Sequence, residues 1–257
     1  MAEWEWSKKK SWSKEDQMYA RKRDVSNKGS REYEHLIGAI YSCKMKRGVQ
    51  YESLWGECLF YYLLELDTLA VRYYEQPVRV PMQNLTKDFV MKNNEHVPDV
   101  LLFRDGSRPH LFQIKGGNDF IQQNPIIYKA CMRYALEEGW DYSVVHPKIM
   151  IPTTIKNNIG FLINYLEPRY YFVNWLPELL YRMEHLKRTD IYRLAKSFEP
   201  KIDHRHILPI IYHLVSTGVL KTNISKKIDH KSEVSFGSIF QEMSQLFEWE
   251  GKKIEVM

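Results

Sequence analysis

The sequence predicts an α/β protein in which a mixed sheet flanked by helices is followed by a smaller unit of three helices and a β-ribbon. Two observations predict this class. Between residues 51 and 167, helical and strand patterns alternate in the order helix, three strands, helix, strand, helix. After residue 168, three short amphipathic segments precede two short strands. We expect a polar basic arm over 1–30, a first domain over 31–168 and a second over 169–257.

The first helix and the strands after it have clear local signals. Residues 51–67 are apolar on nearly every face and predict a buried helix. Residues 71–80 are rich in β-branched and aromatic side chains, which favour a strand. Two further strands, at 97–104 and 110–116, flank Asp105-Gly106, a pair typical of a hairpin turn.

The rest of the first domain is predicted to contain a helix, a strand and a second helix. Residues 124–139 begin with Asn and Pro and stop at Gly139, which are the signals of a helix start and end. A strand at 141–151 and a helix at 153–167 follow. In the second domain we expect a layout typical of a winged helix-turn-helix. Its expected helices lie at 176–187, at 190–198 and from 206 to Gly218, and they are followed by a hairpin of 219–226 with 231–236. A last amphipathic helix is expected at 238–250.

Composition and charge exclude several classes of protein. No apolar run is long enough to span a bilayer, and the first residues lack the apolar core of a signal peptide. We therefore expect a cytoplasmic protein with no membrane partner. The three cysteines, Cys43, Cys58 and Cys131, predict neither a disulfide framework nor a zinc site, because they are scattered and odd in number.

The basic residues gather near both ends of the chain. The net charge is +5; residues 1–50 hold 12 Lys/Arg against 7 Asp/Glu, and residues 187–233 hold 10 against 5. This distribution favours a nucleic-acid partner, with solvated surface charge as the alternative. The arm also carries Trp4, Trp6 and Trp12, and apart from a short helix near 14–24 we expect it to become ordered on a partner.

Polar residues interrupt two of the apolar strands. Asp99 opens the strand at 97–104, while Gln113 and Lys115 share one face of the next strand because side chains alternate. Glu57 lies on the preceding helix, which can pack across the sheet. Such groups suit metal-assisted phosphodiester hydrolysis, with Mg²⁺ held by oxygens of Glu57, Asp99, Gln113 and the Ile114 carbonyl.

In this interpretation Lys115 orients the attacking water and stabilises the transition state. One or two ions are expected, and Mn²⁺ can substitute for Mg²⁺. Structural alternatives remain for each residue. Glu57 can pair with Arg72, Asp99 can cap a turn, and Lys115 can protect an exposed strand edge. His96 and His110 lack the spacing of a metal pair, so we expect both to be structural or on the surface.

These residues carry a resemblance to a known family. The motif Pro98-Asp99, then Gln113-Ile114-Lys115, with Glu57 upstream, resembles the PD-(D/E)xK nuclease superfamily. The Ser53…Glu57 helix and the Glu75-Gln76-Pro77 strand end are similar to those of the TnsA transposon endonucleases. The similarity covers roughly residues 47–235. The chain departs at Trp55-Gly56, where many members have aliphatic residues.

The resemblance implies a restriction-endonuclease-like sheet, a C-terminal winged helix and a Mg²⁺-dependent subunit of a heteromeric transposase. Such a subunit cuts the 5′ ends of the transposon. Its implied partners are double-stranded DNA at the transposon ends, an integrase-type transposase (TnsB type) and an AAA+ ATPase regulator (TnsC type). The resemblance also implies that the catalytic residues are Glu57, Asp99, Gln113 and Lys115. A restriction-type or repair nuclease, or a non-catalytic adaptor that bridges DNA and the ATPase, is the alternative.

Two groups of basic residues are candidates for DNA contacts. Lys44, Lys46 and Arg47 precede the first helix and can bind phosphates near the active site, although a solvated loop explains them equally well. Arg205 and His206 stand where the recognition helix of a winged domain would begin. Winged helices also dock proteins, so base-specific contacts are the weaker expectation for this pair.

Overall fold

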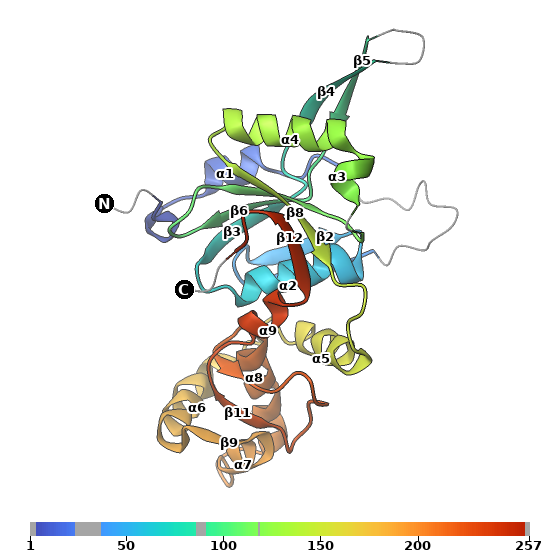
Figure 1. Cartoon of the computed structure of the whole chain (residues 1–257). Coiled ribbons are helices and arrows are strands. Elements are labelled where there is room, and N and C mark those ends of the chain that lie inside the picture. The colour runs from blue at the N-terminus through green and yellow to red at the C-terminus, as the bar shows by residue number, and fades with distance from the viewer. Residues whose placement is uncertain (1–3, 24–36, 86–90, 118, 255–257) are drawn as a thin grey trace.

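A five-stranded mixed sheet forms the centre of the first domain (Figure 1). The computed structural model describes residues 4–23, 37–85, 91–117 and 119–254. The sheet order is β12-β8-β7-β6-β3, with β7 and β8 parallel and the other neighbours antiparallel. This confirms the predicted mixed α/β class. The strands are β3 (Ala70–Glu75), β6 (Val100–Arg104), β7 (His110–Ile114), β8 (Asp141–Pro147) and β12 (Phe247–Gly251).

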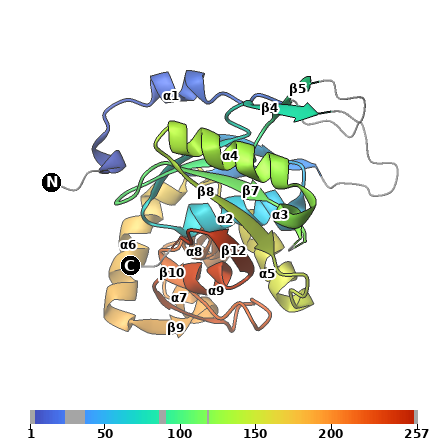
Figure 2. The ribbon, with the colours of Figure 1, turned by 45° about the horizontal axis from the view of Figure 1, so that its top comes forward.

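Helices cover both faces of this sheet, α2 on one face and α4 on the other (Figures 1 and 2). All residues of α2 (Leu59–Leu66) are buried, as expected for a helix that is apolar on every side. Helix α4 (Pro125–Glu137) has Pro at its first position and is followed by Gly139, whose φ of +74° ends it. The short helix α3 (Phe120–Gln123) leads into α4.

The N-terminal segment packs on the sheet of its own chain. Its short helices are η1 (Trp6–Lys8) and α1 (Ser13–Met18). The rings of Trp6 and Trp12 contact Phe103, and Trp6 Nε1 donates to the Ser107 carbonyl at 2.9 Å. The prediction that the arm needs a partner to become ordered is therefore wrong for residues 4–23, because Trp6 and Trp12 pack, partly buried, on the sheet. Residues 24–30 lie outside the described residues.

The strand predicted at 71–80 is divided into two. Strand β3 ends at Glu75, and Gln76 turns the chain with a φ of +47°. The chain then enters a separate hairpin of β4 (Val80–Leu85) and β5 (Met91–His96). A second hairpin, β1 (Gly38–Ser42) with β2 (Arg47–Tyr51), precedes the helical region and was not predicted. The hairpin predicted around Asp105-Gly106 is present, with Gly106 at a φ of +79°.

The second domain contains the three expected helices. Helices α7 and α8 begin at aspartates whose side chains accept backbone N–H groups, Asp190 from Arg193 and Asp203 from Arg205. The sheet beside them has the order β10-β11-β9, one strand more than predicted. The elements are α6 (Phe172–Leu186), β9 (Arg188–Asp190), α7 (Ile191–Lys196), α8 (His204–Ser216), β10 (Leu220–Lys221) and β11 (Glu233–Phe236).

The end of the chain returns to the first domain. We expected a helix over 238–250, but only α9 (Phe240–Ser244) is helical, and β12 then pairs with β8 in the central sheet. The alternation of Phe247 and Trp249 explains the difference, because both rings contact Phe60 of α2 from one face of the strand. The predicted boundary at residue 169 therefore does not separate the two units completely.

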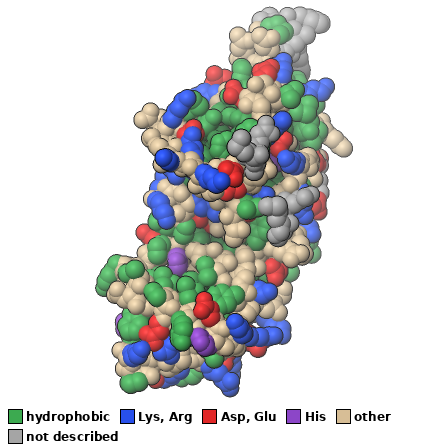
Figure 3. Space-filling view, turned by 90° about the vertical axis from the view of Figure 1, so that its left-hand side faces the viewer, with side chains coloured by type: hydrophobic (Ala, Val, Ile, Leu, Met, Phe, Trp, Pro, Cys, Tyr) green, Lys and Arg blue, Asp and Glu red, His purple; other side chains and the backbone are tan. Residues whose placement is uncertain are grey.

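Charged side chains of both signs, with apolar ones between them, cover the face of the molecule drawn in Figure 3. Within the described ranges, no helix combines the length and the apolar character that crossing a bilayer requires.

Helix α5 (Thr153–Ile163) joins the two domains through a buried asparagine. Asn158 Nδ2 donates to the carbonyls of Ile224 and Lys226 at 2.8 and 2.7 Å, and Asn158 Oδ1 accepts from the Ile228 N–H at 3.0 Å. The side chain of Asn158 is 4% exposed. All its polar groups are thus satisfied, and it holds the segment between β10 and β11 in place.

Replacing Asn158 with Ala should lower the free energy of unfolding by about 2–3 kcal/mol, because three backbone groups lose their partner. Urea unfolding measures this. The neighbouring Asn157 is exposed on the same helix, and Asn157→Ala should change the stability by less than about 0.5 kcal/mol. Equal effects of the two substitutions would show that the Asn158 bonds contribute nothing.

Candidate active site

The predicted catalytic residues meet in one cleft at an end of the central sheet. The cleft has a volume of about 590 Å³ and lies between the turn before α2, the start of β6, the end of β7 and the loop after β8. All five residues predicted to bind metal or act in catalysis border it: Glu57, Asp99, Gln113, Ile114 and Lys115. Segments separated by more than fifty residues in sequence therefore supply a single site.

Asp99 is held by the strand next to it. Its backbone N–H donates to the Phe112 carbonyl at 3.0 Å, and its Oδ2 accepts the Ile114 N–H at 2.6 Å. The Gln113 amide Nε2 donates to the same oxygen. These bonds offset the cost of burying a carboxylate that is only 5% exposed. Asp99 is thus fixed across two strands, which is more than a turn cap requires.

Gln113 lies between Asp99 and His96. Its Oε1 is 2.5 Å from His96 Nε2, so the imidazole determines which way the amide faces. We expected His96 to be structural or on the surface, whereas it borders the cleft and positions Gln113. All five residues of β7 are buried, because α2 and α4 cover opposite faces of the sheet.

Glu57 projects from an unusual turn of helix. Residues Leu54–Cys58 form a π-helical turn (η2) in which the Cys58 N–H donates to the Ser53 carbonyl at 3.0 Å. Such turns often occur at functional sites. A Cβ on Gly56 would lie 2.7 Å from Ser53 Oγ and 3.6 Å from an Ile114 methyl. Glycine therefore leaves room for the Ser53 hydroxyl within the turn that presents Glu57 to the cleft.

Burial raises the pKa of the Glu57 carboxyl to about 8, and the nearby charge of Asp99 adds to the increase. The Glu52 N–H, 2.6 Å from Glu57 Oε2, opposes it. Burial also raises the pKa of Asp99, while the Lys115 ammonium and the Ile114 N–H lower it. Two buried carboxyl groups therefore share one cleft, and the ionisation of Asp99 opposes that of Glu57.

A divalent cation fits this donor set, because it would compensate two buried negative charges. Among the described residues, Glu57 Oε1 and Asp99 Oδ1 accept no hydrogen bond, so each carboxylate has an oxygen left for an ion. Gln113 fits less well as an oxygen ligand. Its amide nitrogen faces Asp99 and its oxygen faces His96, so here it supports the carboxylate.

Lys115 follows β7 and is half-buried. Its ammonium lies 5.5 Å from the centre of the Phe120 ring, and its backbone N–H donates to the Val145 carbonyl at 3.0 Å. Strand β7 lies between β6 and β8, so the alternative that Lys115 protects a sheet edge is wrong. The pairing of Glu57 with Arg72 is also wrong, because Arg72 binds Asp16.

Three further cations border the cleft, and sequence analysis missed them: Arg23, Lys148 and Lys156. Arg23 binds Glu52 and lowers the pKa of both Glu57 and Asp99. Lys156 lies over the Trp55 ring at 5.2 Å. Lys148 follows β8 directly. No local pattern indicates these residues, since each reaches the cleft only through the packing of its segment.

The basic run before the helical region lies elsewhere. The Lys44 ammonium donates to the carbonyls of Asp67 and Ala70 at 2.8 and 2.6 Å. Arg47 makes a two-fold hydrogen bond with Glu75, at 2.6 and 2.7 Å. Lys46 is exposed in the β1–β2 turn, with a φ of +56°. None of the three borders the cleft, so their placement gives the phosphate-binding prediction no support there.

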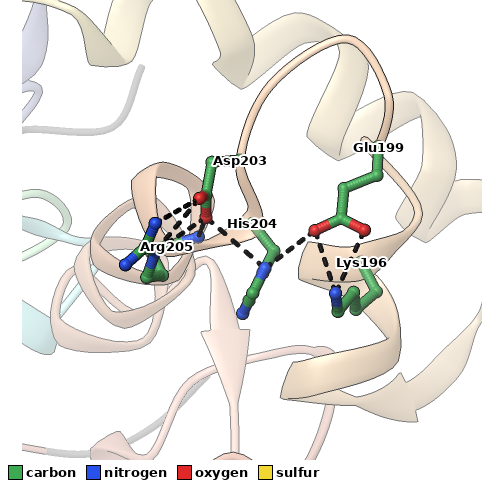
Figure 4. A network of polar contacts seen from close by, with 5 residues as sticks. All are labelled: Lys196, Glu199, Asp203, His204 and Arg205. Carbon is green, nitrogen blue, oxygen red and sulfur yellow. Dashed lines mark hydrogen bonds and ion pairs between the residues drawn. The ribbon is translucent and has the colours of Figure 1, made fainter.

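Arg205 and His206 lie in the first turn of α8, exposed. Figure 4 shows the Arg205 guanidinium turned toward Asp203, with an Nη2 to Oδ2 distance of 2.6 Å. In the same network the ligand atoms of Glu199, Asp203 and His204 lie within 4.8 Å of one another. Lys196 and Arg205 already pair with these exposed carboxylates, so we assign no metal site there.

Comparison with known proteins adds no relative. No protein-family model matches the chain, and no curated protein matches its sequence. The chemistry of this site therefore has to be argued from its own geometry.

The stability of the protein without metal should depend on the ionisation of Glu57. Because its pKa in the folded state, about 8, exceeds the ordinary 4.5, the folded protein binds more protons than the unfolded chain between these values. Its free energy of unfolding must then fall as the pH rises. In EDTA, raising the pH from about 4.5 to about 8 should lower the free energy of unfolding of wild type by about 3–5 kcal/mol relative to that of Glu57→Gln.

Urea unfolding at several pH values gives this difference. The matched control is Glu137→Gln, which removes a carboxylate exposed on α4. Its stability difference from wild type should not change with pH. A constant difference for Glu57→Gln would mean that Glu57 is not buried as described.

Proposed function

We propose that the chain is a divalent-metal-dependent DNA endonuclease of the TnsA type. The observation that carries this proposal is the meeting of Glu57, Asp99, Gln113 and Lys115 in one cleft lined by further cations. The cations suit a substrate with phosphate charges, and the paired carboxylates suit a metal ion. A structural explanation of each residue alone does not account for their convergence.

The architecture supports this proposal. A mixed sheet that carries Asp99 at the start of one strand and Lys115 after the next is the arrangement expected of a restriction-endonuclease-like fold. In the second domain, the order helix, strand, two helices and two strands, with β9 pairing beside β11, supports the proposal of a winged helix. We therefore assign both folds as part of the proposal.

The residues of the cleft have separate roles in this reaction. Glu57 and Asp99 would hold Mg²⁺ or Mn²⁺, with the Ile114 carbonyl as a further ligand. The ion supplies an activated water and neutralises charge that develops on the phosphate. Gln113 and the Ile114 N–H keep Asp99 in position. Lys115 faces the same space and would orient the attacking water and stabilise the transition state.

The biological setting rests on the resemblance of the motifs to those of TnsA proteins. In this setting the chain cuts the 5′ ends of a transposon and leaves 3′-hydroxyl and 5′-phosphate groups. An integrase-type transposase (TnsB type) cuts the other strands, and an AAA+ ATPase (TnsC type) docks on the second domain. Metal-dependent cleavage without any preference for transposon ends would instead favour a restriction-type or repair nuclease.

Removing the Asp99 carboxylate should abolish both metal binding and cleavage. We expect Asp99→Ala to weaken Mn²⁺ binding at least about tenfold, because one of two anionic ligands is lost. Calorimetry with Mn²⁺ measures this on the isolated chain. Cleavage of transposon-end DNA by the chain with its transposase and ATPase partners measures the second effect.

The matched control is Asp141→Ala, which removes a carboxylate paired with Lys252 outside the cleft. It should bind Mn²⁺ and cut as wild type does. If Asp99→Ala cuts the 5′ ends as fast as wild type, the proposed active site is wrong. If wild type binds Mn²⁺ but never cuts, the non-catalytic adaptor is favoured.

Lys115 should affect the reaction without holding the metal. We expect Lys115→Met to slow cleavage about 10²–10³-fold, since a cation that stabilises the transition state is lost. Mn²⁺ binding should remain, because no ligand is removed and a repelling charge disappears. Lys129→Met, on the exposed side of α4, is the control for loss of a lysine. Unchanged cleavage by Lys115→Met would contradict the role given to this residue.

A further inference from the structure

The second domain contains a basic groove that is separate from the cleft. It has a volume of about 860 Å³ and lies between the β10–β11 ribbon and the segment that connects these two strands, residues 222–232. Its lining includes five cations: Arg188, Lys221, Lys226, Lys227 and Lys231. We refer to it as the lysine groove.

Most of the positive charge of the lysine groove is unpaired. Arg188 binds Glu233, so these two charges cancel. The four lysines are exposed and form no ion pair with the described residues. Two further acids border the groove, Asp229 and Glu242. Four lysines against these two carboxylates leave an excess of positive charge that solvent alone balances.

The backbone that carries the lysines is held in place from within. Asn158 of α5 binds the backbone of Ile224, Lys226 and Ile228, as described above. The Asp229 carboxylate accepts the Lys231 N–H at 2.8 Å, and the Ser232 hydroxyl accepts the Asp229 N–H at 2.9 Å. Asp229 therefore shapes the turn as well as bordering the groove. A cationic surface arranged before binding loses less entropy when it binds.

The chemistry of the lining favours a polyanion over a protein surface. Protein partners usually insert aromatic or large apolar side chains into apolar pockets. The large apolar residues of the groove, Ile224 and Val234, are 2% and 1% exposed, so they offer nothing to such a partner. Its accessible hydrogen-bond donors are ammonium, amide and hydroxyl groups, which are the groups that contact phosphate oxygens, and the lysines outnumber the carboxylates of Asp229 and Glu242.

Helix α5 connects the lysine groove with the cleft. Lys156 of this helix borders the cleft, and Asn158, two residues on, anchors the lysine segment. In Figure 1, α5 lies between the central sheet and the second domain. The segment that carries the lysines is therefore anchored to a helix that also borders the cleft.

We propose that the lysine groove binds the sugar–phosphate backbone of double-stranded DNA outside the cleft. This inference rests on the proposed function, because it assigns the second contact for the same substrate. Lys226 and Lys227 are the central residues, since Asn158 holds the backbone on either side of them. The contact is independent of sequence and metal, and it should hold the duplex while the cleft engages one phosphate.

The test is the salt dependence of DNA binding by the full chain in EDTA, which prevents cleavage. Fluorescence anisotropy with a labelled duplex of about 30 bp gives the affinity at several salt concentrations. We expect the double variant Lys226→Gln/Lys227→Gln to lower the slope of log K against log salt by about 1.8, or ~0.9 for each lost phosphate contact.

The control is the double variant Lys10→Gln/Lys14→Gln, which removes the same charge from exposed positions in the N-terminal segment. It should keep the wild-type slope. Equal slopes for wild type and the groove variant, equal decreases in both variants, or no DNA binding by wild type would each overturn the proposal. Displacement of the duplex by poly-glutamate at equal charge would also overturn it, in favour of an acidic protein.

The proposed function can fail separately from this inference. If the chain shows the expected slopes but never cuts DNA, the DNA-binding role of the lysine groove is supported and the nuclease function is contradicted. If the chain cuts DNA in an Asp99-dependent manner but wild type and the groove variant have equal salt slopes, the nuclease function is supported and the role of the lysine groove is contradicted.

Discussion

The hydrogen bond from the Ile114 N–H to Asp99 Oδ2 is the interaction on which the site depends. A buried carboxylate is costly, and this bond across two strands stabilises its charge at a fixed point. Gln113 adds a second bond to the same oxygen, and His96 in turn orients Gln113. The remaining oxygen of Asp99 faces the cleft, where Glu57 presents another buried carboxylate. The fold thus places two carboxyl groups together, and a cation bound between them would favour the ionisation of both.

Gln76 connects this centre to the N-terminal segment. Its backbone N–H donates to the Asp99 carbonyl at 2.8 Å, and its own carbonyl accepts from the Lys22 N–H at 2.9 Å. Its side-chain oxygen accepts two bonds from Arg21. Arg23 follows and reaches the cleft. The Glu75-Gln76-Pro77 turn, noted first as a sequence motif, therefore links a basic segment from the start of the chain to the carboxylates.

The two domains are joined at more than one point. The chain passes from the first domain to the second through α5 and returns through α9 to add β12 beside β8. The returning end packs on α2, where Phe247 and Trp249 meet Phe60. The pairing of β12 with β8 thus ties the second domain to the sheet that carries the cleft.

The sequence by itself determined the mixed α/β class, most helices, the Asp105-Gly106 hairpin and the five residues that border the cleft. These depend on local periodicity and turn chemistry, which neighbouring residues set. Only the tertiary structure decided that Gln76 divides a strand, that Phe247–Gly251 completes the central sheet, and that Arg23, His96 and Lys156 join the site. It also paired Lys44 with the carbonyls of Asp67 and Ala70, and Arg47 with Glu75. Each of these outcomes depends on contacts between residues distant in sequence, whose energies no local pattern contains.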